Sequence, residues 1–258
     1  GDISGATTAT LSIATIATSD EGLYDVVITG TCSTATSNGV LLGVDDNVVI
    51  TTQPGNVTDC EGETAIFSVS VTGTGPLTYQ WRKGGVNLSD GGDISGATTS
   101  TLSIANIEAA DMGSFDVIIA GLCSTVTSSS VTLAVSEKPE IITQPASITV
   151  CAGDNAIFSA DAGITTNPIY QWYVNDGGGW TAAVGARYQG TTTNTLTVVS
   201  ALEMMSGYQY RLRVSGSCTP YVESNIVTLT VTRQAEITQH PVSVTVCETD
   251  PVSFTVNA

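Results

Sequence analysis

The sequence predicts an all-β protein made of tandem β-sandwiches arranged end to end as a rod. Residues 1–44 match residues 92–135 at 28 of 44 positions, so the chain repeats itself at a spacing of 91. Segments such as Ala65–Val71 and Ser114–Ile119 alternate apolar and polar residues, as half-buried strands do. Gly, Asp and Asn clusters separate these segments, and no stretch keeps a helical period. About seven short strands per repeat are typical of a β-sandwich.

A short Ile-Thr-Gln-Pro-like motif opens each repeat, at Ile50–Pro54, Ile142–Pro145 and Ile237–Pro241. We therefore divide the chain into the C-terminal part of a repeat (1–45), a complete repeat (46–136), a complete repeat with an inserted hairpin near 175–184 (137–233), and the N-terminal part of a further repeat (234–258). Half a β-domain cannot bury its apolar face, so we expect a longer array. The alternative is that the end pieces are completed by neighbouring chains, as in swapped polymers.

The charge balance excludes several partners. The formal net charge is −17, with 24 acidic and 7 basic residues, which disfavours nucleic acid and anionic lipid. No run approaches the roughly 18 apolar residues of a membrane span, so direct membrane insertion is not expected. The expected partners are neighbouring repeats of the same or identical chains, and surface glycans.

The order of landmarks resembles that of the immunoglobulin fold. Gly62-x-x-Ala-x-Phe-x-Val69 stands where the second strand is expected, and Tyr79-Gln-Trp81 stands at the third. Asp111-Met-Gly-Ser-Phe115 occupies the position of the Asp-x-Gly-x-Tyr motif. The nearest likeness is to the tandem immunoglobulin-like repeats of large secreted surface proteins in Bacteroidota-type bacteria, including gliding adhesins. Matching segments of the third repeat are Val150–Gly153, Tyr170–Trp172, Gly207–Arg211 and Ser215–Cys218.

This resemblance assigns roles to several core positions. Trp81 and Trp172 are the expected core tryptophans, and Tyr24, Phe115 and Tyr210 are the expected corner aromatics. Phe115 lacks the hydroxyl that a corner tyrosine uses to bind the backbone. The usual inter-sheet cystine positions are apolar: Val26, Val69 with Val117, and Ala160 with Leu212. We therefore expect packing alone to hold each sandwich.

The six cysteines occupy two other positions. Cys60, Cys151 and Cys247 precede the second strand, whereas Cys32, Cys123 and Cys218 follow the sixth. On the immunoglobulin map, nine residues from Cys60 to Val69 span about 30 Å and six from Val117 to Cys123 span about 20 Å. These distances place the two cysteines of one repeat at opposite poles, whereas a disulfide needs Cα atoms within about 7 Å.

The hypothesis that follows is an interdomain disulfide between Cys60 and Cys218. The partners of Cys32, Cys123, Cys151 and Cys247 would then lie outside this segment. An intradomain Cys60–Cys123 bridge, and unpaired or interchain thiols, stay open as alternatives. Paired cysteines suit an oxidising, extracellular setting.

The sequence offers little to catalysis or metal binding. The only histidine is His240, so the complete repeats hold no Ser-His-Asp set and no zinc motif. The acidic loops at Asp45–Asp46 and Asp90–Asp93 lack a calcium-loop pattern. We expect no enzyme, no cofactor and no metal.

One aromatic cluster is a candidate ligand contact. Trp180 lies in the Gly-rich insertion, with Tyr173, Tyr188 and Tyr221 nearby. Exposed aromatic rings on such loops bind sugars or surfaces, whereas the alternative is that Trp180 covers the edge of its own sheet. The overall prediction is an extracellular structural or adhesive protein of the bacterial cell surface, a stiff stalk or filament segment. A polymerising filament or sheath subunit and a carbohydrate-binding module are the alternatives.

Overall fold

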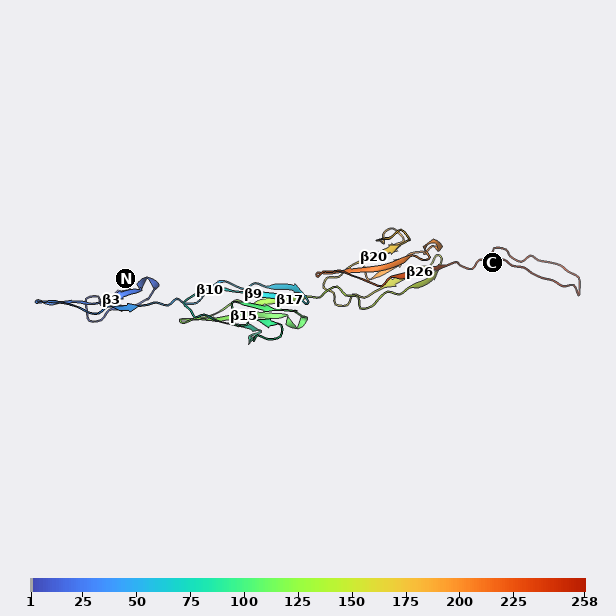
Figure 1. Cartoon of the computed structure of the whole chain (residues 1–258). Coiled ribbons are helices and arrows are strands. Elements are labelled where there is room, and N and C mark those ends of the chain that lie inside the picture. Colours follow the sequence, from blue (N-terminus) through green and yellow to red (C-terminus); the bar gives the residue numbers. More distant parts are fainter. Residues whose placement is uncertain (1) are drawn as a thin grey trace. The chain divides into compact units, whose positions relative to one another are not determined.

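The computed structural model describes residues 2–258, so Gly1, the first residue of the predicted first piece, lies outside it. The chain forms two compact units, Gly1–Val135 and Ser136–Ala258 (Figure 1). The described residues form β-strands and three single-turn 3₁₀ helices. Among them, no helix has the length and apolarity needed to cross a membrane.

The second repeat is a two-layer sandwich. One layer has the strand order β12-β11-β15-β17-β8, with β16 beside β15, and the other contains β13-β14-β9 and the β10-β7 pair. The strands are β7 (Val49–Thr52), β8 (Val57–Cys60), β9 (Ala65–Ser68), β10 (Ser70–Thr72), β11 (Thr78–Lys83), β12 (Val86–Asn87), β13 (Ile94–Ser95), β14 (Thr101–Ile104), β15 (Gly113–Ala120), β16 (Thr125–Thr127) and β17 (Val131–Ser136).

Strand alternation produces the core of this repeat. On β9, Ala65 and Phe67 are buried, whereas Ile66 between them is 58% exposed. The ring of Phe67 stacks on Phe115 of β15 with centroids 5.0 Å apart. Trp81 of β11 is fully buried beside them. The predicted core tryptophan therefore lies between the two layers.

The third repeat repeats this plan. Its larger sheet has the order β18-β26-β24-β20-β21, with β25 beside β24, and its smaller sheet has the order β19-β23-β22. Strand β18 runs parallel to β26. The strands are β18 (Ile148–Cys151), β19 (Ala156–Ser159), β20 (Ile169–Asn175), β21 (Trp180–Ala182), β22 (Tyr188–Gln189), β23 (Thr195–Val198), β24 (Gln209–Ser215), β25 (Val222–Glu223) and β26 (Val227–Thr232). Trp172 is fully buried and packs against Phe158.

A threonine-rich turn explains the most faithfully repeated motif. The hydroxyl of Thr99 lies 2.8 Å from the carbonyl oxygen of Thr101, and it accepts the Thr101 N–H at 3.2 Å. Thr8 and Thr193 make the same contacts in the other copies. Gly96 opens the turn with φ +77°, and a Cβ there would lie 2.1 Å from the Thr101 oxygen. The turn therefore requires both a glycine and the second threonine.

The two corner tyrosines differ from each other. Tyr24 donates its hydroxyl to the carbonyl oxygen of Asp20 at 2.7 Å. Tyr210 is fully buried, and its hydroxyl makes no hydrogen bond of ordinary geometry among the described residues; the group that it interacts with is the hydroxyl of Tyr188, and not a main-chain oxygen. The spacing along the chain explains the difference. Asp20 ends its 3₁₀ turn four positions before Tyr24, whereas Met205 ends its 3₁₀ turn five positions before Tyr210. The extra residue removes the acceptor from its usual place.

The two end pieces have less structure. Residues 2–45 contain the pairs β1-β2, β3-β6 and β4-β5, formed by β1 (Ile3–Ser4), β2 (Ser12–Ile13), β3 (Gly22–Tyr24), β4 (Val27–Thr29), β5 (Thr34–Thr36) and β6 (Val40–Leu42). In residues 234–258, a bridge joins Gln239 and Asn257, and apolar side chains such as Phe254 are exposed.

Candidate functional site

The cysteines of the third repeat lie at opposite ends of its sandwich. Sγ of Cys218 lies 3.3 Å from the carbonyl oxygen of Ser136, where the unit begins. Cys151 pairs in register with Thr232, the last residue of β26. In the second repeat, Cys123 donates its thiol to the carbonyl oxygen of Asp45 at 3.5 Å, again at the N-terminal end. The cysteine after the sixth strand thus marks the N-terminal pole of each complete repeat.

The chemical states of the cysteines also differ. Cys60 and Cys218 are disulfide-bonded. Among the described residues, the four free cysteines are Cys32, Cys123, Cys151 and Cys247, all exposed. The cysteine that shares a repeat with Cys60 and the one that shares a repeat with Cys218 are therefore both free thiols.

The segments that lead into the two complete repeats are each held by a pair of hydrogen bonds, which we call a clasp. The N–H of Asp46 donates to Oγ1 of Thr74 at 2.8 Å, and Thr74 N–H donates back to Asp46 O at 3.2 Å. Ninety-one positions later, Glu137 N–H donates to Oγ1 of Thr166 at 2.8 Å, and Thr166 N–H donates to Glu137 O at 3.4 Å. Each clasp ties the first residues of a repeat to the loop that precedes its third strand.

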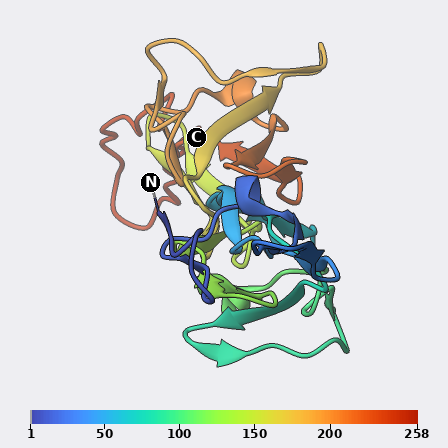
Figure 2. The same ribbon diagram turned by 90° about the vertical axis from the view of Figure 1, so that its left-hand side faces the viewer.

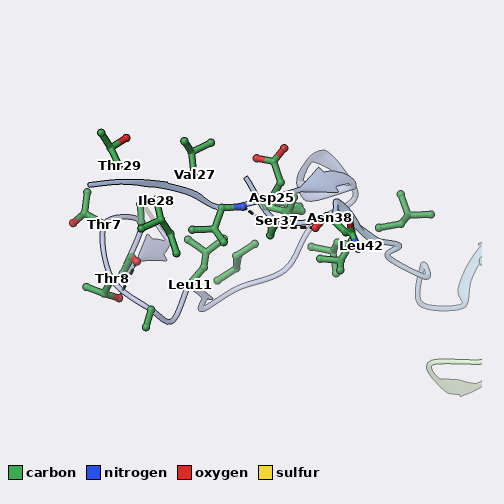
Figure 3. Close-up of a pocket in the computed structure, with 18 residues that line it drawn as sticks. Thr7, Thr8, Leu11, Asp25, Val27, Ile28, Thr29, Ser37, Asn38 and Leu42 are labelled. Carbon is green, nitrogen blue, oxygen red and sulfur yellow. Dashed lines mark hydrogen bonds between the residues drawn. The ribbon is translucent and has the colours of Figure 1, made fainter. Parts of the chain in front are cut away.

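The first piece contains an open apolar hollow (Figure 3). Figure 3 shows Leu11 and Ile28 pointing into it, whereas Val27 and Thr29 point away. Its lining residues correspond, at the 91-residue spacing, to core residues of the second repeat: Ala6, Leu11, Ile13, Tyr24, Val26, Ile28, Val40 and Leu42 match Ala97, Leu102, Ile104, Phe115, Val117, Ile119, Val131 and Leu133, all buried. The hollow is therefore the inner face of a sandwich and not a ligand pocket.

The outer face of the large sheet in the third repeat carries a ladder of rings and guanidinium groups. The guanidinium carbon of Arg211 lies 4.4 Å from the ring centroid of Trp180 and 5.9 Å from that of Tyr173. That of Arg213 lies 4.7 Å from Tyr173 and 4.1 Å from Tyr221. We call these five residues the ladder face. Each arginine is held between two aromatic rings, a favourable cation–π geometry.

Glu223 is the carboxylate of the ladder face. It accepts from Nη1 of Arg211 at 2.7 Å and from Nη2 of Arg213 at 2.8 Å. The hydrogen bond from Arg213 to Glu223 raises the pKa of that guanidinium above its ordinary value. Nε of Arg211 is buried without a hydrogen-bond partner. One carboxylate thus serves two guanidinium groups.

The hairpin between β20 and β21 places Trp180 on this face. Oδ1 of Asn175 accepts the N–H groups of Gly177 and Gly179, at 3.0 and 3.1 Å. The loop, gold in Figures 1 and 2, joins β20 to β21. Trp180 is half-buried, with one face against Arg211. The ring covers its own sheet, and Tyr188 instead packs edge-on against Tyr210.

The arginines of this face were not among the residues that sequence analysis selected. The segment Tyr210-Arg-Leu-Arg-Val214 alternates buried and half-buried side chains, so Arg211 and Arg213 share one side of β24. Tyr173 lies on β20, which neighbours β24, and Trp180 lies on β21, the next strand of the same sheet. Alternate residues of a strand lie on the same face of a sheet. Applied to the neighbouring strands together, this rule would have placed the two arginines on the same face as the predicted aromatic cluster.

The acidic loops considered for calcium are occupied by internal hydrogen bonds. Asp90 accepts the Ala97 N–H at 2.7 Å, and Asp93 accepts from Asn106 at 3.0 Å. Within residues 2–258, no three His, Cys, Asp or Glu side chains form a group suited to a metal ion. His240 lies in the exposed final piece.

Comparisons with known proteins agree with this architecture. Residues 48–135 match the Immunoglobulin I-set domain. The chain is 37% identical over 107 residues to endoglucanase C of Cellulomonas fimi, covering 41% of the chain and 9% of that enzyme. It is 24% identical over 200 residues to human hemicentin-1, covering 76% of the chain and 3% of that protein. The cell adhesion molecule DSCAML1 of mouse is 24% identical over 168 residues, covering 64% of the chain and 8% of that protein.

Solved structures show the same fold. The I-band fragment I67–I69 of titin has a TM-score of 0.63 at 14% identity, with 86% of this chain and 78% of that chain covered. The eight N-terminal immunoglobulin domains of DSCAM give 0.62 at 19% identity, covering 86% of this chain and 29% of that one. The protein therefore has a tandem immunoglobulin-like, all-β fold. The chain spans less than a tenth of the curated relatives it matches.

Proposed function

We propose that the chain is a stiff segment of a stalk or filament on a bacterial cell surface, and that disulfides between successive repeats staple it. The tandem immunoglobulin-like fold, shared with cell-adhesion and titin structures, supports a structural or adhesive role. The 37% identity to a stretch of a bacterial protein, together with the motifs shared with gliding-adhesin repeats, supports a bacterial surface setting.

The state and position of the cysteines carry this proposal. An intradomain pattern needs Cys60 joined to Cys123 and Cys218 joined to Cys151, yet Cys123 and Cys151 are free thiols. Cys218 and Cys123 lie at the N-terminal poles of their repeats, and Cys151 lies at a C-terminal pole. In a head-to-tail array the C-terminal pole of one repeat meets the N-terminal pole of the next, which favours the Cys60–Cys218 pairing.

The clasps support stiffness without any disulfide. Strand β17 continues to Ser136, and Glu137 and Glu140 already donate their N–H groups to Thr166 and Thr165, at 2.8 and 3.0 Å. Few backbone torsions between the second and third repeats are therefore free to act as a hinge. A covalent bridge across the same joint would remove most of the remaining freedom.

Completion of the end pieces by a second copy of the chain is the alternative proposal. Both arrangements would cover the open apolar hollow of residues 2–45, from the same chain in one case and from a neighbouring chain in the other.

Non-reducing peptide mapping of the whole chain tests the proposal. After alkylation of free thiols and proteolysis, we expect a linked Cys60–Cys218 peptide, with alkylated Cys123 and Cys151. A Cys60–Cys123 peptide would refute the staple. Small-angle scattering of the wild type and Cys60→Ser then measures stiffness, and we expect a broader distribution of interdomain distances in the variant. Cys151→Ser is the matched control and should scatter like the wild type.

A further inference from the structure

We propose that the ladder face of the third repeat binds an acidic saccharide, a sugar polymer that carries carboxylate groups. This inference is independent of the stalk proposal, because it concerns the outer surface of one sandwich and not its joints. It rests on three features of the face: an uncompensated positive charge, arginines fixed between aromatic rings, and a hairpin that is longer than its counterpart in the second repeat.

The charge of the ladder face is unbalanced. Arg211 and Arg213 share the single carboxylate of Glu223, which leaves one positive charge in excess. The corresponding face of the second repeat is neutral, because Arg82 pairs with Asp116 through two hydrogen bonds, at 2.7 and 2.8 Å. In a chain of net charge −17, a locally positive surface is an exception that favours an anionic partner. A carboxylate on the ligand would balance the excess positive charge of the two guanidinium groups.

Donor capacity remains for such a ligand. The side chains of Arg211 and Arg213 are 21% and 30% exposed. Arg213 uses Nε and Nη2 toward Glu223, so Nη1 is not committed to that carboxylate. Arg211 contacts Glu223 through Nη1, so its Nη2 is not committed to that carboxylate. A planar guanidinium with unused N–H groups binds a carboxylate with defined geometry.

The aromatic rings of the ladder face favour an acidic sugar over an acidic peptide as the ligand. Tyr221 is 51% exposed, and Tyr173 and Trp180 are half-buried in the same face. Each arginine is already positioned between two rings, so little side-chain entropy remains to be lost on binding. Flat aromatic surfaces beside a fixed cation match a sugar ring that bears a carboxylate, since the ring stacks while the carboxylate pairs.

The inserted hairpin localises this function to the third repeat. In the second repeat, Gly84 and Gly85 join β11 to β12 directly. In the third, Asn175 organises a longer turn that carries Trp180 back over Arg211. Arg82 and Asp116 stand in the second repeat where the third has Tyr173 and Arg211, as the strand registers show. The two repeats therefore form an internal comparison with the same fold and different surface chemistry.

The test is calorimetric titration of the whole chain with oligogalacturonate, and with a cello-oligosaccharide of equal length. We expect binding of the acidic oligomer alone, weakening at least tenfold between 50 and 500 mM NaCl. Arg213→Gln should weaken it at least tenfold, and Tyr221→Ala should weaken it severalfold. Arg82→Gln, the matched control on the second repeat, should leave binding unchanged.

Each other outcome overturns the proposal. Absence of oligogalacturonate binding, or binding that Arg213→Gln leaves unchanged, would mean that the ladder only stabilises its sheet. Equal binding of poly-glutamate would show that the ladder face recognises negative charge alone and not the sugar ring. Thermal unfolding of each variant verifies that the third repeat is folded. If Arg213→Gln does not fold, the exposed Tyr221→Ala decides the question.

Discussion

The indole N–H of Trp81 donates a hydrogen bond to the main-chain oxygen of Thr99 at 2.9 Å. Trp81 belongs to β11 in the larger sheet, whereas Thr99 lies in the turn between β13 and β14 of the smaller one. Trp172 and Thr193 make the same bond at 3.0 Å in the third repeat. The two layers are thus joined by a part-buried polar contact, whereas the usual inter-sheet cystine positions hold the apolar Val69 and Val117.

The hydroxyl of Thr99 should be needed to hold that turn. Thr99→Val keeps the shape of the side chain but removes its bonds to the main chain of Gly96 and Thr101, so we expect a loss of about 1 kcal/mol of unfolding free energy. Denaturant unfolding of the whole chain, followed by Trp fluorescence, measures it. Thr98→Val in the same turn is the control, and equal effects of the two would argue against this role.

Gly96 should not tolerate a side chain. A Cβ would lie 2.1 Å from the Thr101 carbonyl oxygen at a φ of +77°, so we expect Gly96→Ala to cost about 3 kcal/mol. Gly84 also has a positive φ, of +56°, but nothing lies within 4 Å of its Cβ position. Gly84→Ala should therefore cost only about 1 kcal/mol. Calorimetry that found similar losses would show that the close approach is unimportant.

Phe115→Tyr should stabilise the second repeat. Asp111 stands four residues before Phe115, as Asp20 stands before Tyr24, so the new hydroxyl can donate to the Asp111 carbonyl oxygen. We expect a gain of about 1 kcal/mol, measured as a higher melting temperature. Phe67→Tyr, which buries a hydroxyl elsewhere in the same core, should destabilise. A melting temperature lowered by Phe115→Tyr would contradict the corner geometry.

Tyr210→Phe should stabilise the third repeat by about 1 kcal/mol, because it removes a buried hydroxyl that makes no hydrogen bond of ordinary geometry. Burial raises the pKa of Tyr210 above its ordinary value of 10.0. The neutral phenol is therefore favoured in the folded state, and its stabilising contribution is present below pH 10 and lost as the pH rises beyond it.

The pH dependence of unfolding provides the measurement. Wild-type stability should fall between pH 10 and 11.5, and Tyr210→Phe should flatten that fall. Tyr221→Phe, at an exposed tyrosine, should leave the wild-type slope unchanged. If Tyr210→Phe keeps the full slope, other groups must be responsible for it.

Much of the fold was predictable because its causes are local or repeated. Alternation along β9 and β15, the Gly-Ala-Thr-Thr turn and the landmark tryptophans each depend on a few neighbouring residues. The offset of 91 between copies then set the repeats without any knowledge of tertiary contacts. The poles at which the cysteines lie follow from strand direction alone, so they too could be anticipated.

The sequence by itself therefore determined a tandem, immunoglobulin-like, all-β architecture and the positions of its core tryptophans. Only the tertiary structure decided that Tyr210 has no main-chain acceptor, since one extra residue at the corner moves the backbone oxygen away. The ladder face likewise depends on it, because Trp180, Arg211 and Tyr221 come from three separated segments. The register between neighbouring strands brings such side chains into contact. The periodicity of a single strand does not indicate which residues lie opposite it on the next strand.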